Sequence, residues 1–210
     1  MKKNVFILSV MTVAFTGMVT AQTATTDPGV VINGVKWATR NVDKPETFAA
    51  APEDAGLFYQ WNGKRGWSST EPLSSTDGAS EWNVRTKEKG DISWEKSNDP
   101  CPAGWRVPVL DEIKTLLDDD KVTHEWTTEN GVNGKKFTDK ASGNTIFMPA
   151  AGYRYGNAGA LHYAGLNGNY WNSPQNSSED AFYFGFGSDY AGMNLSFGKA
   201  IGLSCRCVAE

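Results

Sequence analysis

The chain carries three cysteines, Cys101 near its middle and Cys205 and Cys207 near its end. What they can do depends on the compartment. Residues 1–21 combine a lysine pair, the apolar run VFILSVMTVAF and small residues before a cleavage point after Ala21, which predicts a cleaved signal peptide. At least one disulfide is expected in the oxidising environment that follows export. Such a bridge would tie the middle of the chain to its end.

The spacing of the two C-terminal cysteines limits how they can pair. Residues two apart on a strand lie about 6.5 to 7 Å apart between Cα atoms, at or beyond the span of a disulfide. Cys205 and Cys207 are therefore poor partners for each other, and Cys101 is expected to be one half of the bridge. The residues alone leave open which of the other two completes it. The odd thiol has no sequence signal for a nearby base, so we predict no catalytic residue and no enzyme activity.

Metal and cofactor sites are not expected either. The two histidines, His124 and His162, stand far apart in a chain without a Cys-x-x-Cys motif, so a zinc site lacks ligands. The acidic run at 118–120 is interpreted as a solvated corner rather than a cation site.

Length indicates one domain, and charge argues against nucleic acid and anionic membranes as partners. We predict a signal peptide over 1–21, a linker over 22–27 and a single domain over 28–210. Loss of the two lysines in the signal moves the formal charge from −4 to −6. Nucleic acid and anionic membranes call for clustered basic residues, which the chain lacks, and no membrane span is expected after cleavage.

Composition favours short strands joined by turns, with 22 Gly, eight Trp, seven Tyr and ten Phe. One amphipathic helix is predicted to start at Pro108 and to end near Asp118, where consecutive aspartates oppose the helix dipole. A hairpin is expected around 138–144. The stretch 63–99 shows no clear period, and its tryptophans would pin it to the body as a packed loop. Strands are expected at 35–42, 56–62, 144–150, 181–187, 193–197 and 202–208.

Several motifs in order carry a family resemblance: WATRNV, FYQWN, DPCPAGWRVPVLDE, MPAAGYR, GNYWNS and the terminal GLSCRCV. From about residue 28 to its end the chain resembles the Fibrobacter succinogenes major paralogous domain family, found in secreted and cell-surface proteins of Bacteroidota and Fibrobacteres. The resemblance implies an α+β, C-type lectin-like fold with short antiparallel strands, one main helix and long loops. It also implies that Cys101 pairs with Cys207, which stands in the family's RCV motif, and that Cys205 stays a thiol. The calcium-binding motifs of C-type lectins are absent, so calcium-dependent sugar binding is not expected.

Loops rich in rings and glycine then remain as the candidate contact surface. Segments 153–176 and 185–197 mix Tyr, Trp, His and Asn with flexible Gly, as carbohydrate stacking or adhesive protein contacts require. Tyr153 and Trp171 belong to the family motifs and are interpreted as packing residues. The predicted ligand-binding residues lie outside those motifs and are Tyr155, His162, Tyr163, Asn169 and Tyr190.

Two functions follow as hypotheses. The first is a non-catalytic recognition module, periplasmic, at the cell surface or secreted, that binds a glycan or a cell-surface protein. The second is a structural component of a cell-surface fibre or adhesin.

Overall fold

The structure is a computed structural model that describes residues 24–82, 92–156 and 158–210. The predicted signal peptide lies outside the described residues. The predicted linker is described from Ala24 on, and there Ala24 pairs with Phe48 while the Asp27 side chain bonds Thr39. The predicted division into signal, linker and domain stays a prediction.

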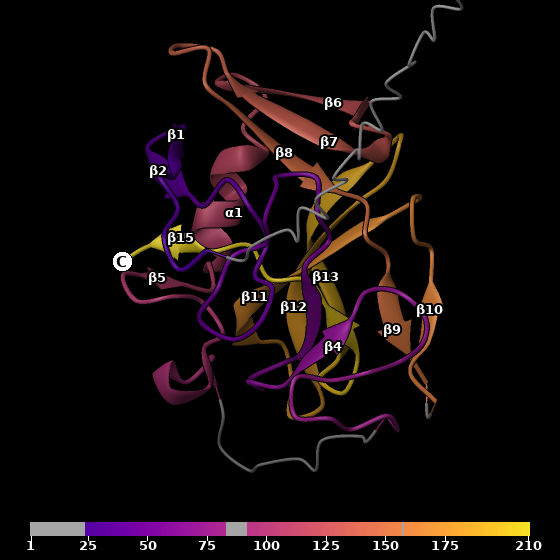
Figure 1. The fold of residues 1–210 in the computed structure, drawn as a ribbon. Coiled ribbons are helices and arrows are strands. Elements are labelled where there is room, and N and C mark those ends of the chain that lie inside the picture. The colour runs from indigo at the N-terminus through magenta and orange to yellow at the C-terminus, as the bar shows by residue number, and fades with distance from the viewer. Residues whose placement is uncertain (1–23, 83–91, 157) are drawn as a thin grey trace, which may run out of the picture.

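Four antiparallel sheets make up the body (Figure 1). The first is β1 (Val30–Ile32), β2 (Val35–Trp37), β15 (Val208–Ala209) and β5 (Trp105–Arg106), in that order. The second is β10 (Ala160–His162), β9 (Tyr153–Tyr155), β14 (Gly202–Leu203), β3 (Leu57–Gln60) and β4 (Gly66–Ser68). The third is β11 (Gly168–Gln175), β12 (Asp180–Phe186) and β13 (Ala191–Gly198), and the fourth is β6 (Val122–Glu129), β7 (Val132–Asp139) and β8 (Thr145–Pro149).

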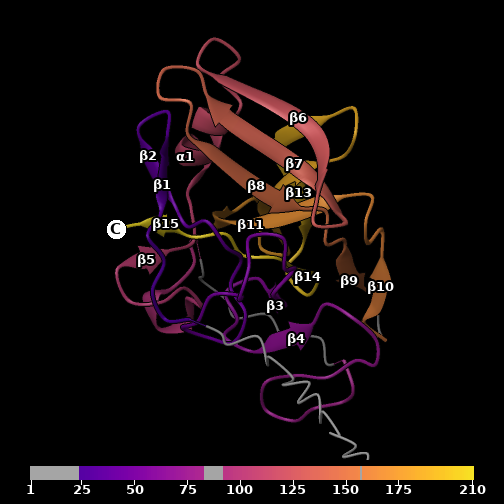
Figure 2. The same cartoon turned by 45° about the horizontal axis from the view of Figure 1, so that its top comes forward.

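Both views give the same arrangement of these sheets. The β1–β2–β15–β5 sheet lies on one side together with helix α1 (Leu110–Leu116), and the β9–β10 hairpin lies on the opposite side (Figures 1 and 2). The β6–β7–β8 sheet crosses one end of the molecule (Figure 2). Aromatic residues fill the core, among them Trp37, Trp61, Trp171 and Phe184, all at most 1% exposed.

The expected α+β fold with one main helix is wrong, because the chain is β-rich. Strands and bridges hold 42% of the described residues and helices 6%. Helix α1 has seven residues and buries only Ile113 and Leu116, too little surface to form a layer over a sheet. The sheets instead bury their apolar faces against one another. A second helical piece, the 3₁₀ turn η1 (Lys96–Asn98), buries none of its residues.

Most local predictions hold, with shifted boundaries. Strands occur within or around each predicted range, and β7 and β8 form the hairpin expected around 138–144. The single strand predicted over 202–208 is divided into β14 and β15. In the residues between these two strands, and outside either ladder, the Cys205 and Cys207 carbonyls accept hydrogen bonds from the Val42 and Ala38 amides. In the stretch 63–99, all three tryptophans are buried: Trp67, Trp82 and Trp94.

The disulfide joins Cys101 to Cys207, as the family resemblance implies, and closes 106 residues of sequence separation. Asp99 fixes the approach to it: its carboxylate accepts the amides of Cys101 at 2.9 Å and Val107 at 3.1 Å. Cys205 is a free, buried thiol in the same core cluster. Burial raises its pKa well above the usual value, and the nearby carboxylate of Asp99 raises it further, so the thiol stays protonated.

Candidate functional site

The β9–β10 hairpin has two chemically different faces, as strand alternation requires. In its register Arg154 stands opposite Leu161, while Tyr153 stands opposite His162 and Tyr155 opposite Ala160. Arg154 and Leu161 face inward, Leu161 against the Trp67 and Trp82 cluster. The tyrosines and His162 therefore project from the other face.

Arg154 anchors the inner face. Its side chain is 1% exposed, and its guanidinium donates to the carbonyls of Ser68, Thr70 and Gly159 at 2.6 to 2.7 Å. It also pairs with the Glu71 carboxylate at 3.0 Å. The planar fork of five N–H donors suits this set of partners. The hairpin is thus held to the segment around residues 68–71.

The outer face carries a cluster of stacked rings centred on Tyr153. The Tyr153 ring stacks on His162 at 5.7 Å and on Tyr163 at 5.8 Å between centroids, and it makes a T-shaped contact with Tyr155 at 6.4 Å. Below it lies Phe197 of β13 at 5.1 Å, and Phe197 in turn stacks on Tyr183 at 4.6 Å. Such offset and edge contacts fix ring orientation. We call the exposed part of this cluster, with Tyr190 at its side, the tyrosine platform: Tyr153, Tyr155, His162, Tyr163 and Tyr190.

Backbone strain sets the position of Tyr163. This residue has φ +54°, a region that bulky side chains rarely occupy and that clusters at functional sites. Its carbonyl accepts the amides of Leu166 and Asn167, which closes the turn after β10. The turn lies so close to Gly152 that a Cβ there would stand 2.2 Å from the His162 carbonyl oxygen. Only glycine permits this approach.

Tyr190 reaches the platform from the turn between β12 and β13. Its hydroxyl accepts a hydrogen bond from Asn167 Nδ2 at 2.6 Å, and its ring lies over Gly187, where a Cβ would meet it at 2.6 Å. Its carbonyl accepts from Lys135 Nζ at 3.0 Å. Burial lowers the pKa of Lys135, while the nearby carboxylate of Asp189 acts in the opposite direction.

The phenols influence one another's ionisation. Burial raises the pKa of Tyr153, and the neighbouring hydroxyls of Tyr163, Tyr155 and Tyr190 raise it further. Burial, with the same kind of neighbour effect, raises the pKa of Tyr183 to about 12. At neutral pH the Tyr153 and Tyr183 hydroxyls are therefore protonated and serve as donors and acceptors without charge.

Four of the five predicted ligand-binding residues come together here. Tyr155, Tyr163 and Tyr190 are 51%, 54% and 41% exposed, and His162 is half-buried between the rings. Asn169 is not part of the platform: it is 3% exposed, its carbonyl accepts the Ser204 amide, and its side chain reaches the Gly152 carbonyl.

Sequence reasoning missed the residues that hold the platform together. Tyr153 is a packing residue, as interpreted, because it lies against the main core cluster, but the sequence reasoning did not foresee that its half-buried ring would also stand at the centre of the platform. Its place two residues before Tyr155 on a strand is the signal that would have put both on one face. Trp171, by contrast, is a core residue as expected, fully buried with its indole N–H donating to the Tyr59 carbonyl. Other supporting residues were not predicted: Leu166, Asn167, Tyr183, Gly187 and Phe197.

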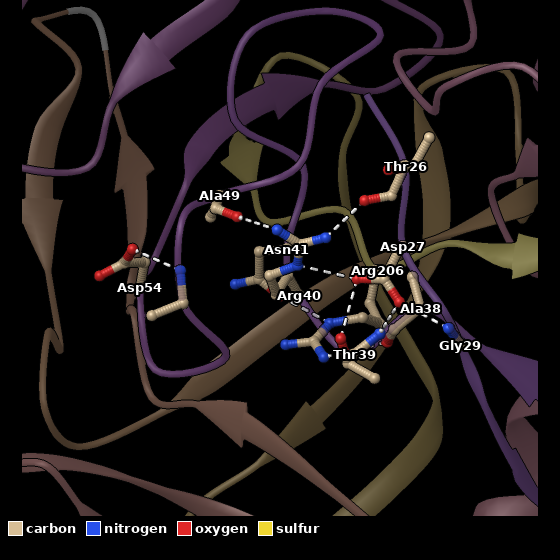
Figure 3. Close-up of polar contacts among 11 residues, drawn as sticks. Thr26, Asp27, Gly29, Ala38, Thr39, Arg40, Asn41, Ala49, Asp54 and Arg206 are labelled. Atoms are coloured by element: carbon tan, nitrogen blue, oxygen red, sulfur yellow. Dashed lines mark hydrogen bonds and ion pairs between the residues drawn. The ribbon is translucent and has the colours of Figure 1, made fainter. Parts of the chain in front are cut away.

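A second polar cluster lies inside the molecule (Figure 3). The Asp27 carboxylate accepts from Arg40 Nε at 2.9 Å, and Arg40 also donates to main-chain carbonyls on both sides. Beside it the buried Arg206 donates to Asn41 Oδ1 at 2.8 Å and to the Ala38 carbonyl at 3.2 Å. Burial lowers the pKa of Arg206. These side chains bond other groups of the protein, and they hold segment 38–41 to residue 27 on one side and to Arg206, between β14 and β15, on the other.

The acidic run, a metal site and a membrane span are the remaining features to be located. The acidic run at 118–120 lines an open cleft of about 590 Å³ with Lys114 and Lys121 among its walls. Within the described ranges, no group of three or more His, Cys, Asp and Glu side chains is placed to hold a metal ion. In the same ranges no helix is long and apolar enough to cross a membrane.

Comparison with family models, curated proteins and solved structures gave no match. The family resemblance of the motifs therefore stays a prediction.

Proposed function

We propose that the protein is an exported, non-catalytic recognition module that binds its partner, a glycan or a cell-surface protein, through the tyrosine platform. The proposal includes membership of the resembled domain family, whose proteins are secreted or displayed at cell surfaces. Calcium has no part in the contact.

One observation carries the proposal. Among the described residues, seven large hydrophobic side chains are exposed, and four of them gather at or beside the platform: Tyr155, Tyr163, Leu166 and Tyr190. Exposed apolar residues scattered singly are ordinary, whereas a cluster marks a contact surface. Tyrosine supplies ring area and a hydroxyl at low entropic cost, which is why it is enriched where proteins bind partners.

The rings are also fixed before any partner arrives. Stacking around Tyr153, the bond from Asn167 to Tyr190 and the tight turn at Gly152 leave them little freedom. Folding has therefore already ordered these rings, and they lose little conformational entropy when a partner binds.

A glycan array with the mature chain tests the proposal, using wild type, Tyr155→Ala/Tyr163→Ala and a control. The control is Ile92→Ala, which removes a side chain that is 72% exposed and lies outside the platform. Binding to glycans or to partner cells should fall for the platform variant only, with melting temperatures of all three close together. Equal binding by all three proteins would contradict the proposal.

The fibre hypothesis predicts a different result. If the platform contacts further subunits of the same chain, light scattering should show oligomers that dissociate in the Tyr155→Ala/Tyr163→Ala variant.

A further inference from the structure

We infer that the ligand of the tyrosine platform is an uncharged glycan, whose sugar rings stack on Tyr155 and Tyr163 and whose hydroxyls bond the surrounding phenols. This inference rests on the proposed function and names the class of ligand.

The first support is the exposure of the Tyr155 ring, which is 51% exposed. Its cross-strand partner in the β9–β10 hairpin is the exposed Ala160, whose methyl group is too small to cover a phenol. The neighbouring pair Tyr153 and His162, by contrast, stack on each other. Tyr155 thus meets this cluster by edge contacts, at 6.4 Å to Tyr153 and 6.0 Å to His162, and presents ring area to solvent. The C–H face of a pyranose is a flat, weakly polar surface of the kind that packs on such a ring.

The second support is charge. From Tyr155 to Ser178 the sequence has no Asp, Glu, Lys or Arg. At the edge beside Tyr190 stand Lys135, which is 3% exposed and bonded to the Tyr190 carbonyl, and Asp189, whose opposite charge acts on it. Sulfate, phosphate and carboxylate groups are recognised by Arg and Lys side chains that can reach them. The platform offers rings and neutral donors in their place.

The third support is the hydroxyl on each exposed ring. Tyr155, Tyr163 and Tyr190 are all phenols, and Asn167 adds an amide that already bonds the Tyr190 hydroxyl. A ligand that matches this set needs apolar C–H faces and many neutral hydroxyls, which together describe an uncharged saccharide. A protein interface of standard size buries about 800 Å² on each side and is enriched in Met and Arg as well as in aromatic rings, whereas the platform consists of four tyrosines and a histidine.

Affinity gel electrophoresis of the mature chain tests the inference with two sets of soluble polysaccharides. The uncharged set is hydroxyethyl cellulose, glucomannan, xyloglucan and galactan, and the acidic set is polygalacturonate and heparin. The variants are Tyr155→Ala, Tyr155→Phe and the control Ile92→Ala. Melting temperature confirms that each is folded.

We expect at least one uncharged polysaccharide to retard the protein, equally at low and high salt, because no ion pair is screened. Tyr155→Ala should weaken this retardation about tenfold, the loss of one stacking contact, while Tyr155→Phe retains most of it. Ile92→Ala should behave as wild type.

Three outcomes overturn the inference. Salt-sensitive retardation by the acidic set alone, lost in Tyr155→Ala, would leave the proposed function standing and reject the uncharged ligand. If no polysaccharide retards the protein, and Tyr155→Ala instead abolishes binding to a protein partner or self-association, the proposed function again stands and the uncharged glycan is rejected. If Tyr155→Ala changes neither glycan binding, nor partner binding, nor self-association, the proposed function fails as well.

Discussion

Removing the disulfide between Cys101 and Cys207 should cost much of the stability of this domain. The clean comparison is made in a Cys205→Ala background, so that the buried third thiol has no opportunity to pair with Cys101. The perturbation is Cys207→Ala added to that background. Both positions are fully buried in the same core cluster, so each substitution removes a comparable amount of packed sulfur.

The magnitude follows from the length of chain that the bridge closes. With a sequence separation of 106 residues, the chain-entropy relation gives about 4.8 kcal/mol at 25 °C. Cys205→Ala alone forfeits only the packing of one sulfur atom, about 1 kcal/mol. For a domain of this size, loss of the bridge corresponds to a fall in melting temperature of about 10 to 20 °C.

Urea unfolding followed by tryptophan fluorescence measures these differences, with peptide mapping of unreduced protein to verify the bridge. Reduced wild type should resemble the double variant, because reduction removes the same cross-link. The reasoning is refuted if reduction leaves the urea midpoint unchanged, or if Cys205→Ala destabilises the domain as much as loss of the bridge does.

Three further predictions concern the anchors of the fold. Arg154→Met should cost about 3 to 5 kcal/mol in urea unfolding, because it leaves the carbonyls around residues 68–71 without their donor, whereas Arg65→Met at an exposed pair with Asp77 should cost under about 1 kcal/mol. Burial raises the pKa of Asp27, but hydrogen bonds from Thr39, Arg40 and Gly29 together hold it below the usual 3.8. Its contribution is therefore complete above pH 3.8 and lost on further acidification, so the stability gap to Asp27→Asn should close only there. Gly131→Ala, at φ +84°, should cost about 1 to 2 kcal/mol by thermal unfolding, and Gly131→Asn less.

What could be predicted from the sequence is what short-range chemistry determines. The helix after Pro108 was correctly located because its period and its acidic end are local signals, and the structure has it at Leu110–Leu116. Strands β6 and β7 were not predicted, because they carry Thr, Glu and Lys and do not look apolar, and without them the share of strand was underestimated. The turn between β6 and β7 nonetheless has a clear sequence signal. Asn130-Gly131, like Asn33-Gly34 between β1 and β2, has both residues at positive φ, the requirement of a two-residue hairpin turn.

The exposed residues of the candidate site could be predicted where local composition determines exposure. They could not be predicted where a distant segment of the chain covers a residue. Tyr155 and Tyr163 lie among glycines in a segment without charges, so an exposed position could be expected. Asn169 lies in a similar context, yet both faces of the first part of β11 are buried. The reason is the C-terminal segment, whose Ser204 pairs with Tyr170 and accepts the Trp171 amide. No local pattern in β11 announces that a segment 34 residues later will cover it.

The two faces of the β9–β10 hairpin show how the fold makes a small site rigid. Strands of three residues supply few ladder hydrogen bonds, so the pairing alone would not hold Tyr155 in place. Arg154, one position away on the same strand, supplies the missing restraint by bonding main-chain carbonyls of the 68–70 segment. Because adjacent residues on a strand point to opposite faces, every bond that Arg154 makes inward also fixes the direction in which Tyr153 and Tyr155 point outward. The end of β4 and the residues that directly follow it, from Ser68 to Glu71, therefore help to orient the platform, although they contribute no ring to it.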